Sequence, residues 1–513
     1  MIAAAPPKSQ INLVPVQQSS SSIQLVVPIV IGMLITILLV IAARGGDLLI
    51  HIKTYLFTYT ISFALMIACF ALLRNFGRRE FTLVFVFAII FRIVMICAPP
   101  TLSDDIYRYV FDGRLSANGI NPYLYRPDAP ELVAFQDKAV FSQMSSGTVY
   151  SVYPPVSQAI FLLGFVTGHP LTAIKVVYSI FDLGIIILLW MLIGELGLPR
   201  RNIILYAWNP LPIYEFAGSG HTDATLLFFT LLAILLFARK RYFGSFTALG
   251  FAIISKLLPV IFLPYFFFAM RGRKRYYLAI WSGVVVILGY LPFAGALPTV
   301  VKNFTTDVGL YLSSLYIFNG SLYTFWYWVR DTFHIYGRFT DFGFMASALS
   351  ILFGLTWLGI VVSAWMRRGK EDLPQIAWRI MLTFFAFLVC SPNVQIWYIS
   401  WILCFVPIIV NFDHVNNGAG FVGKLAQTRS SWLTWSCTGC FAYIAYNHYF
   451  AYKGPFSAPA WTVWLEYGLM FGLLANELFS AKQRESSPKT VMLTDPNPAQ
   501  SLFASQRHHG IDS

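Results

Sequence analysis

The chain has 513 residues, of which 57% are hydrophobic and 12% charged, and its mean hydropathy is +0.65. This composition excludes a large soluble enzyme and indicates a polytopic membrane protein. The formal net charge of +13 does not indicate nucleic-acid binding, because most Lys and Arg residues lie in short clusters between apolar segments, where they orient membrane helices. Cys437 and Cys440 form a CxxC in an apolar segment without a partner pair, so a metal or redox site is not expected there.

The N-terminal segment 1–24 is rich in Pro, Ser and Gln and is expected to be a disordered, cytoplasmic extension. The apolar run 25–43 follows without a clear cleavage site, which predicts an uncleaved membrane helix. This helix opens a membrane domain that we expect to extend over 25–480. The polar tail 481–513 is predicted to be cytoplasmic and disordered.

Apolar runs at 54–73 and 81–98 flank the basic segment 74–80. Positive charge between spans marks the cytoplasmic side, so this segment is predicted to be cytoplasmic. Counting outward from it places the loop 101–153 on the extracytoplasmic face. By the same reasoning the turn 218–223 is also extracytoplasmic.

Later basic clusters predict further cytoplasmic turns, at 239–242, 271–275 and 367–373. The run 243–270 begins and ends beside such charge, so it is predicted to be a hairpin of two short helices, broken near Lys256 and Pro259. Further spans are expected at 202–217, 276–294, 345–366, 375–391, 395–411, 432–450 and 460–478, with a second external loop at 295–344. The predicted fold is therefore all-α, with about 13–14 transmembrane helices.

The best-patterned polar stretch is the start of the first external loop, Thr101 to Tyr125. Ser103 is a predicted N-cap, and a helix is predicted from Asp104 to about Ala117. The adjacent carboxylates Asp104 and Asp105 are candidate catalytic groups. Acids in a first helical turn also favour the helix dipole, so a purely structural role is the alternative.

The same loop and its close supply most of the candidate substrate-binding residues. These are Tyr107, Arg108, Asp112, Arg114, Tyr123, Tyr153 and Gln158. Arg108 lies four residues from both Asp104 and Asp112, a spacing that stabilises a helix by itself and needs no ligand.

Other candidates reach the same face from later segments. His221 and Asp223 start the helix after the second external turn, although they could simply cap it. Lys256 lies about 13 residues into the hairpin, so a helical rise of about 1.5 Å per residue brings it about 20 Å toward the outer interface, where it either binds a ligand or snorkels. Gln395 and Tyr398 follow another outer turn. Aromatics at such a turn, here Trp397 and Tyr398, are also common interface anchors. Carboxylates, a His and cations facing one compartment favour a site for a sugar and a phosphate.

These residues resemble the GT-C membrane glycosyltransferases that use polyprenyl-phosphate sugars, most closely the bacterial polyprenol-phosphate-mannose-dependent mannosyltransferases and more distantly phosphatidylinositol-glycan mannosyltransferase. The similarity rests on a set of short motifs spread over about 80–400: Ser103-Asp104-Asp105, Tyr107, Asp112-Gly113-Arg114, Gly119, Asn121-Pro122-Tyr123, Tyr153-Pro154-Pro155 and Gly220-His221-Thr222-Asp223. The family often separates its two loop acids by one residue, whereas here they are adjacent, which leaves the base open between them. We expect Asp104 to be the base, with Asp105 as the alternate, because Asp104 directly follows the predicted N-cap Ser103 and the resemblance favours the first acid of the pair.

The resemblance implies transfer of a hexose, mannose by analogy, from a polyprenyl-phosphate donor to a glycan or glycolipid hydroxyl, with inversion, on the outer face of a bacterial plasma membrane. A carboxylate would deprotonate the acceptor and cations would stabilise the lipid phosphate. Membrane lipids are expected partners and nucleic acid is not. Adjacent acids could hold a divalent ion such as Mg²⁺ or Mn²⁺, but a metal-free base fits equally well. The alternatives are a transporter or flippase of a lipid-linked sugar, and a polysaccharide polymerase or ligase.

Overall fold

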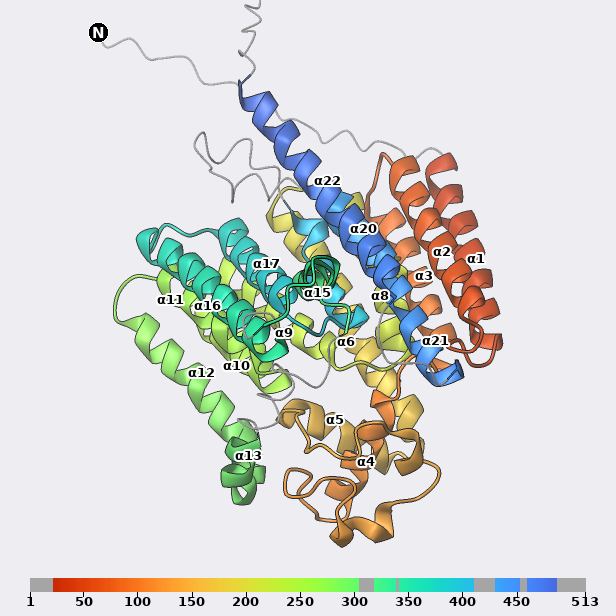
Figure 1. The fold of residues 1–513 in the computed structure, drawn as a ribbon. Helices are drawn as coiled ribbons and strands as arrows, with labels where there is room; N and C mark the ends of the chain where they lie inside the picture. The colour runs from red at the N-terminus through yellow and green to blue at the C-terminus, as the bar shows by residue number, and fades with distance from the viewer. Residues whose placement is uncertain (1–21, 304–317, 338–340, 410–429, 453–458, 487–513) are drawn as a thin grey trace, which may run out of the picture.

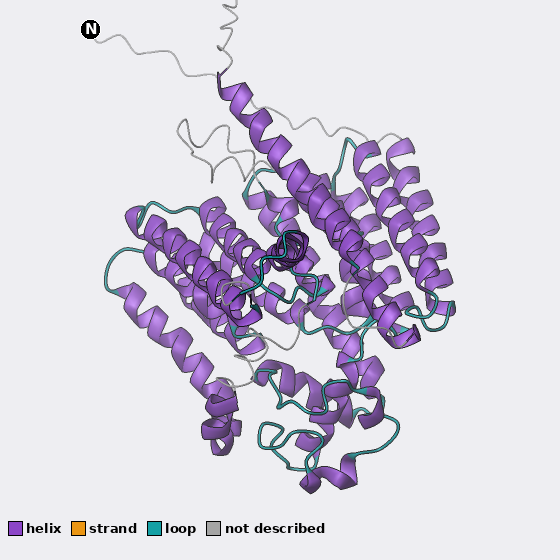
Figure 2. Cartoon of the chain, viewed as in Figure 1, coloured by secondary structure: helices purple, strands orange, loops and turns teal. Residues whose placement is uncertain are grey.

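The computed structural model describes residues 22–303, 318–337, 341–409, 430–452 and 459–486. This part of the chain is helical and contains no strand, only isolated bridges from Phe318 and Asn319 to Asn393, as Figure 2 shows. The prediction of an all-α membrane protein is therefore confirmed. The expectations for 1–21, for 487–513 and for parts of the loop 295–344 lie outside the described residues. Residues 22–24 and 481–486, which the sequence predicts to be disordered, are instead helical, because the first and last described helices extend over them.

The first helices form a bundle that ends in a lobe made by the first loop (Figure 1). They are α1 (Ser22–Arg44), α2 (Ile52–Leu72), α3 (Arg78–Ile96), α4 (Asp105–Ala117), α5 (Pro155–Val166) and α6 (Pro170–Glu195). The lobe contains α4 and α5 and lies at one end of the bundle. Glu80 closes the start of α3 by accepting a hydrogen bond from the Gly77 N–H at 2.8 Å.

The remaining helices complete the bundle. They are α7 (Ile204–Ala207), α8 (Pro210–Pro212), η4 (Ile213–Gly218), α9 (Asp223–Ala238), α10 (Tyr242–Ser255), η5 (Leu258–Phe262), α11 (Leu263–Ala269), α12 (Lys274–Tyr290), α13 (Leu297–Asn303), α15 (Ser321–Thr332), α16 (Phe342–Met366), α17 (Leu373–Cys390), α18 (Ser400–Leu403), α20 (Ser430–Thr438), α21 (Tyr443–Tyr452) and α22 (Ala460–Ser486). Short 3-10 turns join several of them, including Ile396–Ile399 before α18.

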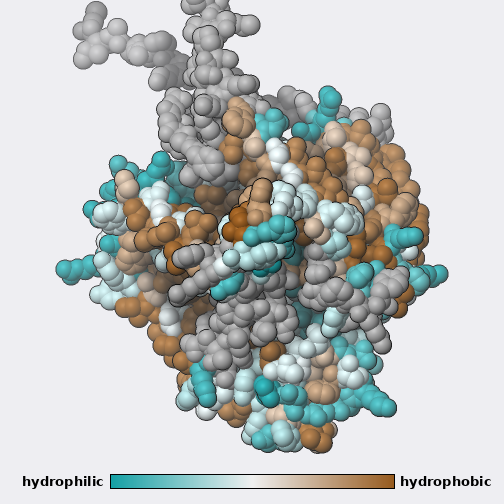
Figure 3. Space-filling view, in the orientation of Figure 1, coloured by the Kyte–Doolittle hydropathy of each residue, from teal (hydrophilic) through white to brown (hydrophobic). Residues whose placement is uncertain are grey.

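Six described helices are long and apolar enough to cross a membrane, or seven if the bent pair Pro210–Gly218 and Asp223–Ala238 counts as one span. Apolar side chains cover much of the face seen in Figure 3. The larger predicted number of about 13–14 included short apolar helices such as Tyr242–Ser255 and Ile396–Ile408. The number of membrane crossings therefore stays a prediction.

The predicted break in the hairpin is present at Lys256, whose backbone is extended between α10 and η5. Pro259 lacks the N–H that would bond the carbonyl of Ser255 four residues earlier. That carbonyl instead accepts a hydrogen bond from the Ser157 hydroxyl at 3.3 Å. The helix consequently ends at Ser255, and the side chain of Lys256 leaves it.

The predicted span 202–217 is not one helix. The helix α7 ends at Ala207. Asn209 then caps α8 by accepting from the Leu211 N–H at 3.0 Å, and a π-helical turn follows over Ile213–Gly218. The chain then bends by 120° before α9. Gly220 takes the left-handed conformation at this bend, with φ of 76°, which glycine adopts without strain.

The lobe is attached by close packing of α4 on α5. The rings of Tyr109 and Phe161 stack with centroids 4.5 Å apart. A Cβ atom added at Gly113 would lie 2.3 Å from the backbone oxygen of Phe161. Glycine at this helical position therefore allows the two backbones to approach.

We expect Gly113→Ala to separate α4 from α5 and to destabilise the protein by about 1–3 kcal/mol, because the clash is with backbone that cannot rotate away. The thermal unfolding midpoint of the purified protein checks this. Gly147→Ala is the control, since its added Cβ would come no closer than 3.6 Å to Phe141. Equal midpoints for the two variants would contradict this account of the packing.

Candidate active site

The site is organised around His221, which is fully buried at the bend before α9. Its Nδ1 lies 3.7 Å from Oδ2 of Asp105, and its Nε2 lies 3.3 Å from Oε2 of Glu215. The imidazole stacks on the Trp397 ring at 3.6 Å between centroids, which fixes its plane. His221 thus links a carboxylate of the lobe to one inside the bundle.

Glu215 lies in the π-helical turn and is fully buried. The hydroxyl of Tyr443 donates to its two carboxylate oxygens, at 3.1 and 2.9 Å. A neutral imidazole has one N–H, yet both nitrogens of His221 face carboxylate oxygens. A single N–H can serve only one of these two contacts. Both contacts are therefore favourable only when Asp105, His221 and Glu215 together hold one proton more than the neutral imidazole carries.

A cation lies on the other side of the site. Lys256 Nζ donates to Oδ1 of Asp223 at 2.8 Å, and the indole N–H of Trp401 donates to the same oxygen at 2.6 Å. The ammonium also lies 4.3 Å from the Tyr398 ring centroid and 4.7 Å from that of Trp401. The Lys256 side chain is 27% exposed, and an ammonium has three N–H donors, so donors remain for an anionic ligand.

Asp105 is the carboxylate of this site that a substrate can reach, because 31% of its side chain is exposed. Partial withdrawal from water raises its pKa to about 7, and the negative charges of Asp104 and Asp223 add to the rise. Lys256 and Arg108 oppose it. A carboxylate with this pKa is a stronger base than an ordinary aspartate and is still largely ionised slightly above neutral pH.

Asp104, the base expected from the sequence, is held differently from its neighbour and does not make the contact with His221 that Asp105 makes. The helix begins at Asp105, with Asp104 as the N-cap residue, one position later than the sequence predicts. The Ser103 hydroxyl accepts from the Asp105 N–H at 3.3 Å. Oδ2 of Asp104 accepts from the Ser145 N–H at 2.6 Å, so this carboxylate is engaged within the lobe and the acids diverge.

Four predicted binding residues form a buried network inside the lobe. Arg108 Nε donates to Asp112 Oδ1 at 2.8 Å, and Gln158 Nε2 donates to Asp112 Oδ2 at 3.1 Å. Gln158 also contacts the carbonyl oxygen of Tyr153, at 3.4 Å. Arg108 and Asp112 are therefore paired as the helical spacing alone suggested, and the network holds the loop in place.

The other predicted residues lie around this core. Arg114 forms an ion pair with Asp137 on the loop, and the Tyr123 hydroxyl donates to the Tyr153 carbonyl at 2.6 Å. The amide of Gln395 is occupied by Asn393 and Tyr446. Tyr107 is partly buried against the apolar core. The structure thus gathers Asp105, His221, Asp223, Lys256 and Tyr398, and places the remaining residues beside them.

Sequence reasoning missed Glu215 and Tyr443. Glu215 is a lone acid in the apolar stretch Ile213–Gly218, and an ionisable residue at membrane depth is a functional signal by itself. Its proximity to His221 depends on the π-helical turn and the bend, which no sequence pattern announced. In the described ranges, no group of three or more His, Cys, Asp and Glu side chains is arranged to hold a metal ion.

The helical fold with its apolar candidate spans, and the reachable carboxylate beside an ammonium, are consistent with a membrane glycosyltransferase of the GT-C-like kind. Residues 27–272 match the family model described as alpha-(1->6)-mannopyranosyltransferase, N-terminal domain. The N-terminal part of the chain is thus similar to that mannosyltransferase family, which confirms the resemblance seen in its motifs. No curated protein matches the chain.

Proposed function

We propose that this protein transfers mannose from a polyprenyl-phosphate donor to a hydroxyl group of a glycan or glycolipid acceptor. One observation supports the proposal most: a reachable carboxylate, Asp105, and a partly exposed cation, Lys256, are close enough for the charge of one to shift the pKa of the other. The match of residues 27–272 to a mannosyltransferase family model supports the choice of sugar. A lipid-phosphate donor carries its own leaving group and needs no nucleotide pocket.

In the proposed reaction Asp105 takes the proton of the acceptor hydroxyl as its oxygen attacks C1 of mannose. The C1–O bond to the phosphate breaks, and its electron pair leaves with the lipid phosphate. Lys256 stabilises that charge with its remaining N–H groups. Displacement from the opposite face inverts C1, so an alpha product, as the family description names, requires a beta-linked donor.

His221 and Glu215 position the base in this scheme. Glu215 supplies the second proton, donating it to Nε2, so that Nδ1–H of His221 points at Asp105. Asp105 then stays ionised and correctly turned until the acceptor proton arrives. Tyr443 fixes the Glu215 carboxyl from behind.

The proposed active face is extracytoplasmic. Supporting it, the helix α12 starts at the basic segment Arg271–Arg275 and runs toward the end of the bundle that carries α4 and α5 (Figure 1). Positive charge favours the cytoplasmic side, so the lobe and Asp105 belong opposite it. A plasma-membrane protein of this orientation would meet its acceptor outside the cell.

The purified protein, incubated with polyprenyl-phosphate mannose and an oligomannoside acceptor, should release polyprenyl phosphate in equal amount to mannosylated product. Substitution of GDP-mannose for the lipid donor is the control and should give no product. Transfer from GDP-mannose alone would contradict the lipid donor. Movement of intact donor across a vesicle membrane without cleavage would support the flippase alternative instead.

We expect Glu215→Gln to keep kcat within about tenfold of wild type, since an amide N–H can replace the carboxylic O–H toward Nε2. Glu215→Leu leaves that nitrogen unpaired and should lower kcat by about 10²-fold or more, because the imidazole tautomer is no longer fixed. It should also move the acidic limb of the pH profile to higher pH, since a carboxylate that loses a donor has a raised pKa.

Glu466→Leu is the control for loss of a buried acid, because Glu466 bonds Asn319 and Trp435 and not His221. It should lower stability without moving the pH limb. An unchanged limb in Glu215→Leu would contradict the positioning role and leave the assignment of Asp105 intact.

A further inference from the structure

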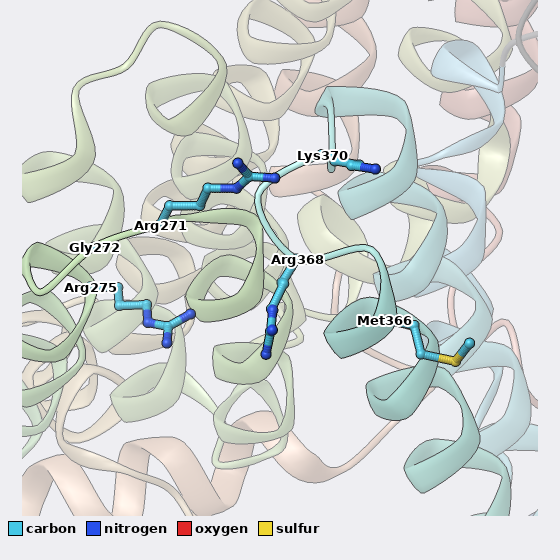
Figure 4. Close-up of a pocket in the computed structure, with 6 residues that line it drawn as sticks. All are labelled: Arg271, Gly272, Arg275, Met366, Arg368 and Lys370. Carbon is cyan, nitrogen blue, oxygen red and sulfur yellow. The ribbon is translucent and has the colours of Figure 1, made fainter.

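A cavity of about 480 Å³ lies far along the chain from the acids of the lobe, and we call it the basic pocket. It is lined by Arg271, Gly272, Arg275, Met366, Arg368 and Lys370. Figure 4 shows Arg271, Arg275 and Arg368 gathered between two loops, with Lys370 and Met366 at the rim. Four of its six lining residues are cations and none is an acid.

The two loops are joined, so the pocket is preformed. The Gly369 N–H donates to the Phe268 carbonyl at 2.8 Å. Gly369 has φ of 67°, and a Cβ there would lie 2.1 Å from Nε of Arg271. This close fit holds the α11–α12 loop against the α16–α17 loop. Cations that only set the membrane topology would not need the two loops to be joined in this way.

The charges of the pocket lack acidic partners. Glu371, the nearest acid in the sequence, is occupied by Arg379 at 2.8 and 2.9 Å, and Asp372 accepts from the Gln375 N–H at the start of α17. No ion pair among the described residues includes a pocket cation. Arg275 bonds Met270 and Tyr276, but its buried Nε has no partner.

The pocket opens at the ends of two helices whose apolar sides are exposed. The candidate spans Lys274–Lys302 and Gly343–Met366 are each only 11% buried over their most apolar windows. Met366, which lines the pocket at the end of α16, is 75% exposed, and Tyr277 in the first turn of α12 is 70% exposed. Cations at the membrane interface with apolar surface leading away from them match an anionic headgroup and its acyl chains.

We propose that the basic pocket binds the phosphate of an anionic membrane lipid, with the acyl chains lying along α12 and α16. The binding chemistry is charge-assisted hydrogen bonding from guanidinium groups to phosphate oxygens. Such a lipid would brace the two loops on the face that the sequence predicts to be cytoplasmic, away from Asp105.

Thermal unfolding of the full-length protein in neutral detergent, titrated with phosphatidylglycerol, phosphatidylcholine or inorganic phosphate, tests this, because a ligand of the folded state raises the midpoint. Phosphatidylglycerol should stabilise at concentrations at which the other two do not. The double variant Arg368→Gln/Lys370→Gln changes two exposed side chains of the pocket. It should need about tenfold more phosphatidylglycerol for the same rise in the unfolding midpoint.

Arg78→Gln/Arg79→Gln is the matched control. It removes the same charge from the segment 74–80, which is predicted to be on the same face, and should respond within about twofold of wild type. Equal stabilisation by phosphatidylcholine, or equal losses in both double variants, would overturn the site. Stabilisation by inorganic phosphate alone at the same concentration would overturn the lipid as its ligand.

Discussion

Asp105→Asn is expected to lower kcat by about 10²–10⁴-fold with the protein folded and the donor still bound, because an amide cannot take the acceptor proton. Wild-type activity should rise with pH through about 7, since the reaction needs the ionised form of a carboxyl whose pKa burial raises to about 7. The amide variant should lose that acidic limb. Initial rates of polyprenyl-phosphate release between pH 5.5 and 8.5 would show both effects (a window of roughly 1.5 units either side of that pKa).

Asp104→Asn is the control at the adjacent residue. At the start of α4, the Asp104 carboxylate accepts a hydrogen bond from the Ser145 N–H. An amide oxygen can accept the same bond, so kcat should fall by less than about tenfold. An inactive Asp104→Asn beside an active Asp105→Asn would move the base by one residue. Near-normal turnover in both variants would remove this loop from catalysis and with it the proposed function.

Lys256→Met should lower kcat/KM for the donor by about 10²–10³-fold, because it removes the cation that faces the departing phosphate. It also leaves the buried carboxylate of Asp223 with the Trp401 indole N–H as its hydrogen-bond donor among the described side chains. Initial rates at varied donor concentration, with the acceptor saturating, measure this. A raised donor KM should accompany the fall if the cation also holds the phosphate in the ground state.

Lys256→Arg keeps the charge at the helix break and should recover part of the lost rate. Wild-type donor kinetics in Lys256→Met would mean that this side chain merely reaches toward the interface. Equal losses in Lys256→Met and Lys256→Arg with an unchanged donor KM would assign it to packing against Tyr398 and Trp401.

The break at Lys256 was predictable because a proline removes a specific helical hydrogen bond, and Pro259 stands four residues after the carbonyl that loses it. The pairing of Arg108 with Asp112 was predictable as the structural alternative, since side chains four apart on a helix are neighbours. In both cases the cause is local in the chain. The family resemblance likewise depended on motifs that are contiguous in sequence.

The choice between Asp104 and Asp105 was not predictable, because it depends on a one-residue difference in where α4 begins. The role of Glu215 depends on a π-helical turn and a 120° bend that bring it to His221. Trp397 resembled an interface anchor in the sequence, yet it stacks on His221 from 176 positions further along. Contacts over such separations are set by the packing of the whole bundle.

The stacking of Trp397 on His221 bears on the biogenesis of the enzyme. The region that matches the family, 27–272, contains Asp105, His221 and Lys256, but Trp397, Trp401 and Tyr443 are synthesised long after it. A chain that has been synthesised only as far as this region therefore contains Asp105 and Lys256. It still lacks the rings that pack against His221 and Lys256 in the complete protein. The candidate site is therefore complete only after the segment that carries Tyr443 has been synthesised and packed against Glu215.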